Sequence, residues 1–179
     1  MAIKQVDLLK LSALYGEGLN REFSSTQHVM KIPKPRIFII HNIWDFRMVQ
    51  GLIVMLSFAG IDAFYDWDDG YATDATYETS EDNLIKRVSA ARACMLLATK
   101  KSVCAPLSIT ALEYATLIHR KTYLVLTEAE GQTYGEEFIG VHPQLDVLTS
   151  KRYNRNYVVR ILENDRSNFW KNLHNISGL

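Results

Sequence analysis

The sequence lacks an excess of charge of either sign, a set of cysteines and a long apolar segment. Its 179 residues include 20 Lys and Arg and 20 Asp and Glu, so the formal net charge is zero. Without a basic excess there is no electrostatic footprint for nucleic acid or anionic lipid, and we expect neither as a partner. The two cysteines, Cys94 and Cys104, do not make a disulfide framework. No apolar run approaches the roughly 18 residues that a membrane helix needs.

Short signatures of common sites are also missing. There is no GxGxxG run and no phosphate-binding loop, so a Rossmann dehydrogenase has no support. The first residues, MAIKQVDLLKLSALYG, do not follow the charged, apolar and small-residue order of a secretion signal. Hydrophobic residues make up 47% of the chain, as in an ordinary soluble globule, and we expect a cytoplasmic protein.

Three segments differ in their patterning. Residues 1–35 contain a predicted helix over 3–20, whose leucines Leu8, Leu11 and Leu14 should pack on the protein, and then a polar linker. Residues 36–150 form the predicted main domain. Residues 151–179 form a predicted extension with a helix over 156–173.

Strand-like and helix-like segments alternate within the main domain. The first, RIFIIH, is apolar on both faces, as a central parallel strand requires. The pattern predicts helices at 45–58, 80–91 and 108–119, and strands at 36–41, 61–67, 94–99, 123–127 and, briefly, 136–139. This alternation predicts an α/β fold with a central parallel sheet of about five strands and helices on both faces. Such sheets bind ligands at the carboxyl ends of their strands.

Several motifs resemble those of Toll/interleukin-1 receptor (TIR) domains, in the order of that family. RIFIIHN resembles the opening strand, with His41 in the histidine position and Asn42 in that of a serine. Asp45 stands where the family often has an acid. GIDAFYDWDD resembles the second strand of a bacterial TIR-like subgroup, ACMLLAT follows as the third strand, and FIGVHPQL resembles that subgroup's tail. The resemblance covers residues 36–148.

The resemblance implies a flavodoxin-like fold and a reaction. Enzymatic members of the family cleave the nicotinamide–ribose bond of NAD, giving nicotinamide and ADP-ribose or a cyclic isomer. NAD is then a substrate, no cofactor is implied, and the role is bacterial antiviral defence signalling. The implied protein partners are further copies of the chain or another TIR-type or effector protein.

The family's catalytic residue is a glutamate in the helix after the third strand, usually preceded by a tryptophan that is absent here. Glu113 is the only acid of that helix and inherits the role, although an alignment on Tyr114 and Ala115 would put Ala111 in the catalytic position. A carboxylate there could stabilise the oxocarbenium-like charge on the ribose. Glu113 could equally be a solvated residue on the exposed side of an amphipathic helix.

The binding candidates stand at the predicted strand ends. His41, Asn42 and Asp45 follow the first strand, where His41 and Asn42 could bond a ribose or phosphate or cap the next helix. Trp67 and Tyr71 could stack on adenine or nicotinamide, although Trp67 could also be core.

Charged residues complete the set. Asp68 belongs to an acidic run with Asp66 and Asp69, but no further ligand follows at a suitable spacing, so we expect no metal. Scattered basic residues flank the third and fourth strands and could either meet phosphates or be plain surface: Lys100, Lys101, Arg120 and Lys121.

Two alternatives to an NAD-cleaving enzyme stay open. The first is a non-catalytic TIR-like interaction module that assembles through the loop at 68–79. The missing tryptophan favours it, whereas the strand ends around His41 and Trp67 favour the enzyme. The second is a nucleoside deoxyribosyltransferase-like enzyme, which shares the α/β layout and glutamate-dependent glycosidic chemistry.

Overall fold

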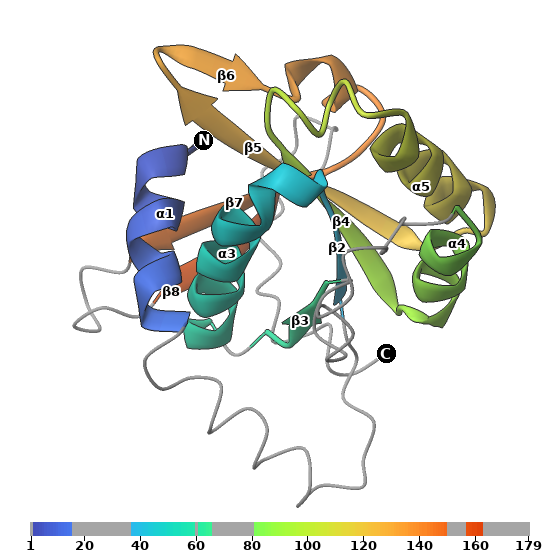
Figure 1. The fold of residues 1–179 in the computed structure, drawn as a ribbon, viewed down its shortest axis with the longest axis horizontal. Coiled ribbons are helices and arrows are strands. Elements are labelled where there is room, and N and C mark those ends of the chain that lie inside the picture. Colours follow the sequence, from blue (N-terminus) through green and yellow to red (C-terminus); the bar gives the residue numbers. More distant parts are fainter. Residues whose placement is uncertain (1, 16–36, 60, 66–80, 150–156, 163–179) are drawn as a thin grey trace, which may run out of the picture.

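A computed structural model describes residues 2–15, 37–59, 61–65, 81–149 and 157–162, drawn as coloured ribbon in Figure 1. Several predicted features lie outside these residues. They are the linker before the first strand, the site candidates Trp67, Asp68 and Tyr71, the loop at 68–79 and the stretch 163–173 of the predicted terminal helix.

The centre of the fold is a parallel sheet. Its path runs β3 (Ala63–Phe64), β2 (Ile37–Ile40), β4 (Ala93–Ala98), β5 (Lys121–Ala129), β7 (Gln144–Thr149) and β8 (Tyr157–Leu162). Every neighbouring pair from β3 to β7 is parallel, and β8 is antiparallel to β7. The predicted α/β, flavodoxin-like fold is therefore confirmed, as is the central position of the first strand of the main domain, between β3 and β4.

The helices cover both faces of the sheet. In Figure 1, α1 (Gln5–Leu14) and α3 (Phe46–Phe58) lie on the left, and α4 (Glu81–Ala90) and α5 (Pro106–Leu117) lie on the right. All four residues of β2 are buried, with Ile37 and Ile39 in the core under α1 and α3. Phe38 and Ile40 lie in the core under α4 and α5. A strand buried on both faces explains the unbroken apolar run that the sequence shows there.

The N-terminal segment packs on the domain, as predicted, but over a shorter helix. It begins with a two-residue strand, β1 (Ile3–Lys4), which pairs with β5, and α1 follows. Leu8 is fully buried and Leu11 is partly buried, while Leu14 is 45% exposed. The prediction that Leu14 is buried is wrong, because Leu14 lies about 120° around the helix from the buried Leu8, away from the face that packs on the core.

Two C-terminal predictions are also wrong. Residues 136–138 form a 3-10 turn, η3 (Glu136–Phe138), instead of a strand; a short strand, β6 (Gln132–Tyr134), precedes it and forms a hairpin with β5. Residues 157–162 form β8 instead of the start of a helix. Val158, Val159 and Ile161 are β-branched and favour a strand, which the antiparallel ladder with β7 satisfies.

None of the described helices is long and apolar enough to cross a membrane.

Candidate functional site

The candidate site is the carboxyl edge of the sheet where β2 and β4 lie side by side. The chain leaves β2 to form β3 on one side and later returns as β4 on the other. In open α/β sheets such a reversal opens a crevice in which ligands bind. The 3-10 turn η2 (Ile43–Asp45) and the loop from β4 to α5 lie together at this edge, at the top of Figure 1.

His41 directly follows β2. Its Nδ1 lies 3.1 Å from the carbonyl oxygen of Ile39, which can only accept, so Nδ1 carries the proton in this contact. Its ring meets that of Tyr65 edge-on, with 5.8 Å between the centroids. Burial lowers the pKa of His41 to about 4, against a smaller raising effect of the Ile39 hydrogen bond. The imidazole is therefore neutral near pH 7 and offers Nε2 as an acceptor.

Asn42 acts as a cap. Its side-chain oxygen accepts a 3.1 Å hydrogen bond from the backbone N–H of Trp44, and its carbonyl oxygen accepts one of 2.8 Å from the N–H of Asp45. Of the two predicted roles for Asn42, the structure displays the capping role. The two bonds close the η2 turn and hold the side chains of that turn in place.

Asp45 lies beneath the turn and is 3% exposed. Its carboxylate accepts a short hydrogen bond from the Thr99 hydroxyl, just after β4. Burial raises the pKa of Asp45, and both the Thr99 hydrogen bond and the charge of Lys101 oppose that shift. Asp45 therefore ties η2 to the end of β4, and too little of it is exposed for it to bind a ligand directly.

Ser102 completes this buried network. The Thr99 N–H donates to its hydroxyl oxygen over 2.7 Å, and its own N–H donates to Thr99 Oγ1 over 3.0 Å. The Ser102 hydroxyl donates in turn to the carbonyl of Leu97 over 2.6 Å. One connected set of hydrogen bonds thus joins the η2 turn, through Asp45, to the end of β4.

The start of α5 joins the same edge. Pro106 begins the helix, where its missing N–H costs nothing, and the Ser108 hydroxyl donates to the carbonyl of His41 over 3.3 Å. The buried face of α5 consists of Ser108, Ala111, Leu112 and Ala115.

Glu113 is not part of this cluster. It is exposed on α5, while Ala111 and Leu112 beside it are buried. At about 100° per residue, Glu113 lies about 140° around the helix from Ser108 and about 7.5 Å further along its axis. The structure therefore brings His41, Asn42 and Asp45 together and leaves Glu113 outside, on the solvent face. Ala111, the alternative in the catalytic position, is 1% exposed.

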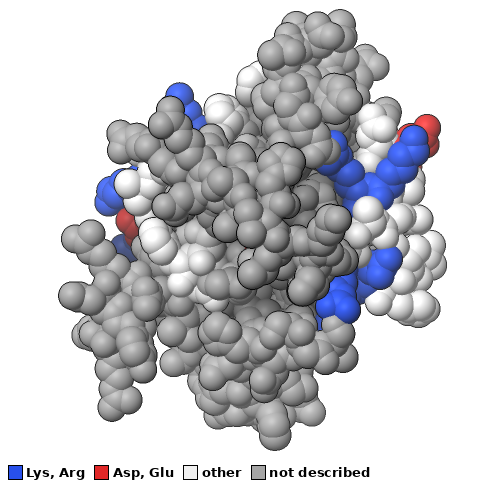
Figure 2. All heavy atoms as spheres, turned by 90° about the horizontal axis from the view of Figure 1, so that it is seen from below, with Lys and Arg blue, Asp and Glu red and all other residues white. Residues whose placement is uncertain are grey.

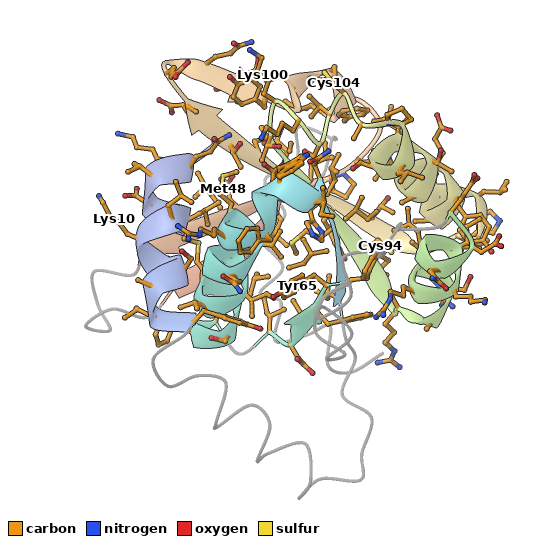
Figure 3. The ribbon with its side chains drawn as sticks, in the orientation of Figure 1. Lys10, Met48, Tyr65, Cys94, Lys100 and Cys104 are labelled. Carbon is orange, nitrogen blue, oxygen red and sulfur yellow. The ribbon has the colours of Figure 1, made fainter. Side chains whose placement is uncertain are left out.

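The basic candidates divide between the two ends of the sheet. Lys100 and Lys101 follow Thr99 after the end of β4 at the carboxyl edge, and Figure 3 shows Lys100 there together with Cys104. Arg120 and Lys121 stand at the start of β5, at the opposite edge. Figure 2 views the molecule from that side, with described Lys and Arg side chains gathered on its right flank. Arg120 donates to the carbonyl of Ser89 over 2.7 Å, a structural contact.

Three functional positions were missed by the sequence reasoning. Thr99 and Ser102 stand directly after a buried strand at a three-residue spacing that suits side-chain hydrogen bonds to the backbone, and this signal could have found them. Trp44 lies between the predicted strand at 36–41 and the predicted helix at 45–58, and the sequence reasoning gave it no role. In the structure it is 74% exposed on η2.

No group of three or more His, Cys, Asp or Glu suited to a metal ion occurs among the described residues.

Comparison with models of known protein families and with curated proteins found no match to this chain.

Proposed function

We propose that this chain binds NAD at the carboxyl edge of its sheet and cleaves the nicotinamide–ribose bond, as a TIR-like protein of bacterial antiviral defence. The proposal rests on the resemblance of RIFIIHN and GIDAFYDWDD to that family. The observation that carries it is the grouping of His41, Asn42 and Asp45 beside β4, at the reversal point of a flavodoxin-like sheet. The carboxyl ends of the strands at such a reversal point are the usual ligand site of this fold class.

The reaction needs little from the protein beyond positioning and charge. The bond between ribose C1′ and the nicotinamide nitrogen breaks with its electron pair leaving on nicotinamide, which is neutral once released. Water, or a nitrogen of the adenine in a cyclisation, then bonds to C1′ and loses a proton. A carboxylate near the ribose stabilises the positive charge that develops on it. The family resemblance assigns that charge to Glu113, which lies on the solvent face of α5 outside the cluster. Neutral His41 offers a hydrogen-bond acceptor.

The second candidate is a non-catalytic TIR-like interaction module, in which the chain assembles with copies of itself or with an effector. The exposed position of Glu113, away from His41 and Asp45, favours it. In that function the carboxyl edge and the outer face of α5 would be contact surfaces.

One experiment separates the two. Purified protein is incubated with NAD at several protein concentrations, and nicotinamide, ADP-ribose and cyclic products are separated and measured. The first proposal predicts nicotinamide release from the wild type and a fall of about a hundredfold or more in Glu113→Gln, which keeps the size of the side chain and removes its charge. Glu137→Gln, an exposed glutamate of η3, is the matched control and should keep the wild-type rate.

Each outcome has a clear meaning. No nicotinamide from the wild type at any concentration would reject NAD cleavage in favour of the interaction module. Release at equal rates from wild type and Glu113→Gln would keep the enzyme and reject Glu113 as its catalytic carboxylate.

A further inference from the structure

The outer surface of η2 presents an aromatic ring that the core does not use. Trp44 is 74% exposed, with its neighbours Ile43 and Phe46 at 37% each. A large aromatic ring exposed in this way often marks a binding surface. This ring also lies at the reversal point of the sheet, where α/β sheets bind their ligands. The ring stands on a rigid base, because the Asn42 cap and the Asp45–Thr99 hydrogen bond hold the turn on both sides.

Cations stack on the aromatic rings of this surface. The Nζ atom of Lys101 lies 5.7 Å from the centroid of Trp44, and the guanidinium carbon of Arg47 lies 5.9 Å from that of Phe46. Lys100 is exposed beside Lys101. The negative charge of Asp45 is buried beneath the turn and engaged by Thr99, so the exposed charges on these segments are positive.

An aromatic face next to exposed ammonium groups suits one class of ligand, a flat heteroaromatic base that carries phosphate. The base can stack on the indole, and the phosphate can pair with lysine. An ammonium group over the ring also keeps the site partly covered until a ligand displaces it.

We propose that Trp44 and Lys101 form a nucleotide-binding platform at the carboxyl edge. The base of the ligand stacks on the face of Trp44 that Lys101 covers, and the displaced ammonium group of Lys101 pairs with the phosphate. This inference rests on the proposed function for its location and for NAD as the natural ligand. It concerns binding alone, so ADP, which has no nicotinamide to lose, tests it independently of cleavage.

The test is calorimetric titration of the full chain with ADP, adenosine and pyrophosphate. Trp44→Ala should weaken ADP and adenosine binding at least about tenfold, and Trp44→Phe, which keeps a ring, should weaken them much less. Lys101→Met should weaken ADP and pyrophosphate while leaving adenosine within about twofold. Lys10→Met is the matched control, since Lys10 is an exposed lysine on α1, away from this edge in Figure 3, and should bind all three ligands like the wild type.

Two results would overturn the platform. The first is the same ADP affinity in wild type and Trp44→Ala. The second is that the wild type does not bind ADP. Both substituted side chains are exposed, so the variants should unfold at the wild-type temperature, and circular dichroism checks this.

Failure of the platform and failure of the proposed function are distinguishable. If the wild type releases nicotinamide and Trp44→Ala binds NAD unchanged, the platform is rejected and the enzyme stands. If Trp44→Ala loses ADP binding in a chain that never cleaves NAD, the platform stands and the enzyme is rejected.

Discussion

Asp45 shows how a single residue shapes the candidate site. A carboxylate that is 3% exposed loses most of its hydration, and burial raises its pKa accordingly. The Thr99 hydroxyl replaces part of the lost hydration, and in doing so it joins the turn after β2 to the end of β4. The stability of the turn that carries Trp44 thus depends on a hydroxyl from a different strand.

Replacement of Thr99 tests this dependence. Thr99→Val keeps the shape of the side chain but leaves Asp45 and the N–H of Ser102 without their partner, and we expect a loss of about 2–3 kcal/mol in the free energy of unfolding. Thr99→Ser keeps the hydroxyl and should lose no more than about 1 kcal/mol, for one methyl group. Urea unfolding followed by circular dichroism measures both. A valine variant as stable as the serine variant would contradict the argument.

His41 makes a prediction about pH. Its pKa is about 4 in the folded protein and 6.5 ordinarily, so the unfolded chain binds a proton between these values that the folded chain does not. Stability is therefore complete above about pH 6.5 and falls as the pH drops towards 4, by about 2–3 kcal/mol at pH 4.5 from this residue. Burial also lowers the pKa of His142, which acts in the same direction.

Single substitutions separate the two histidines. The free energy of unfolding of the wild type should be lower at pH 4.5 than at pH 7. In His41→Gln this difference should be smaller by about 2 kcal/mol. His142→Gln measures the share of the second histidine. The free energy of unfolding could instead fall by the same amount between pH 7 and pH 4.5 in His41→Gln as in the wild type. That result would show that the His41 ring is not held neutral in the folded protein.

At the scale of elements, α1 and α3 approach each other unusually closely. An added Cβ at Gly51 would lie 1.9 Å from the carbonyl oxygen of Leu8. Because this oxygen belongs to the backbone, no rotation of a side chain could relieve the clash. Leu8 is fully buried in the core beneath both helices. Glycine at position 51 therefore allows the N-terminal helix to dock.

Gly51→Ala should separate these helices. The clash should destabilise the protein by about 1–3 kcal/mol, in spite of the better helix propensity of alanine. The rate of amide hydrogen exchange should increase more in α1 than in the strands of the sheet. Gly140→Ala, where nothing lies within 4 Å of an added Cβ, is the control and should change stability by no more than about 0.5 kcal/mol. Unchanged exchange in α1 of the Gly51 variant would show that the close contact is unimportant for docking.

The elements also show what the sequence pattern could predict. Buried strands such as β2 and β4 were predictable, because a parallel strand covered on both faces is apolar throughout. The antiparallel pairing of β7 with β8 was not, since it is decided by tertiary contacts. Helix periodicity placed α5 to within two residues but did not decide which side of it Glu113 occupies.

At the scale of the whole molecule, strand order decides which residues meet. His41 and Asn42 could be assigned to a ligand edge from the sequence, because they follow a predicted central strand. Their neighbours Thr99 and Lys101 are more than 50 positions away and become adjacent only through the β2–β4 pairing. The exposure of Trp44 also depends on the assembled edge, since its local sequence, IWDF, is as apolar as a core segment.

The most direct test of the central proposal is photoaffinity labelling with an azido-adenine analogue of NAD, followed by peptide mapping. If NAD binds at the carboxyl edge, the label should lie in residues 41–47 or 99–104, and unlabelled NAD should compete it away. Labelling confined to α1, or labelling that NAD does not suppress, would contradict the site.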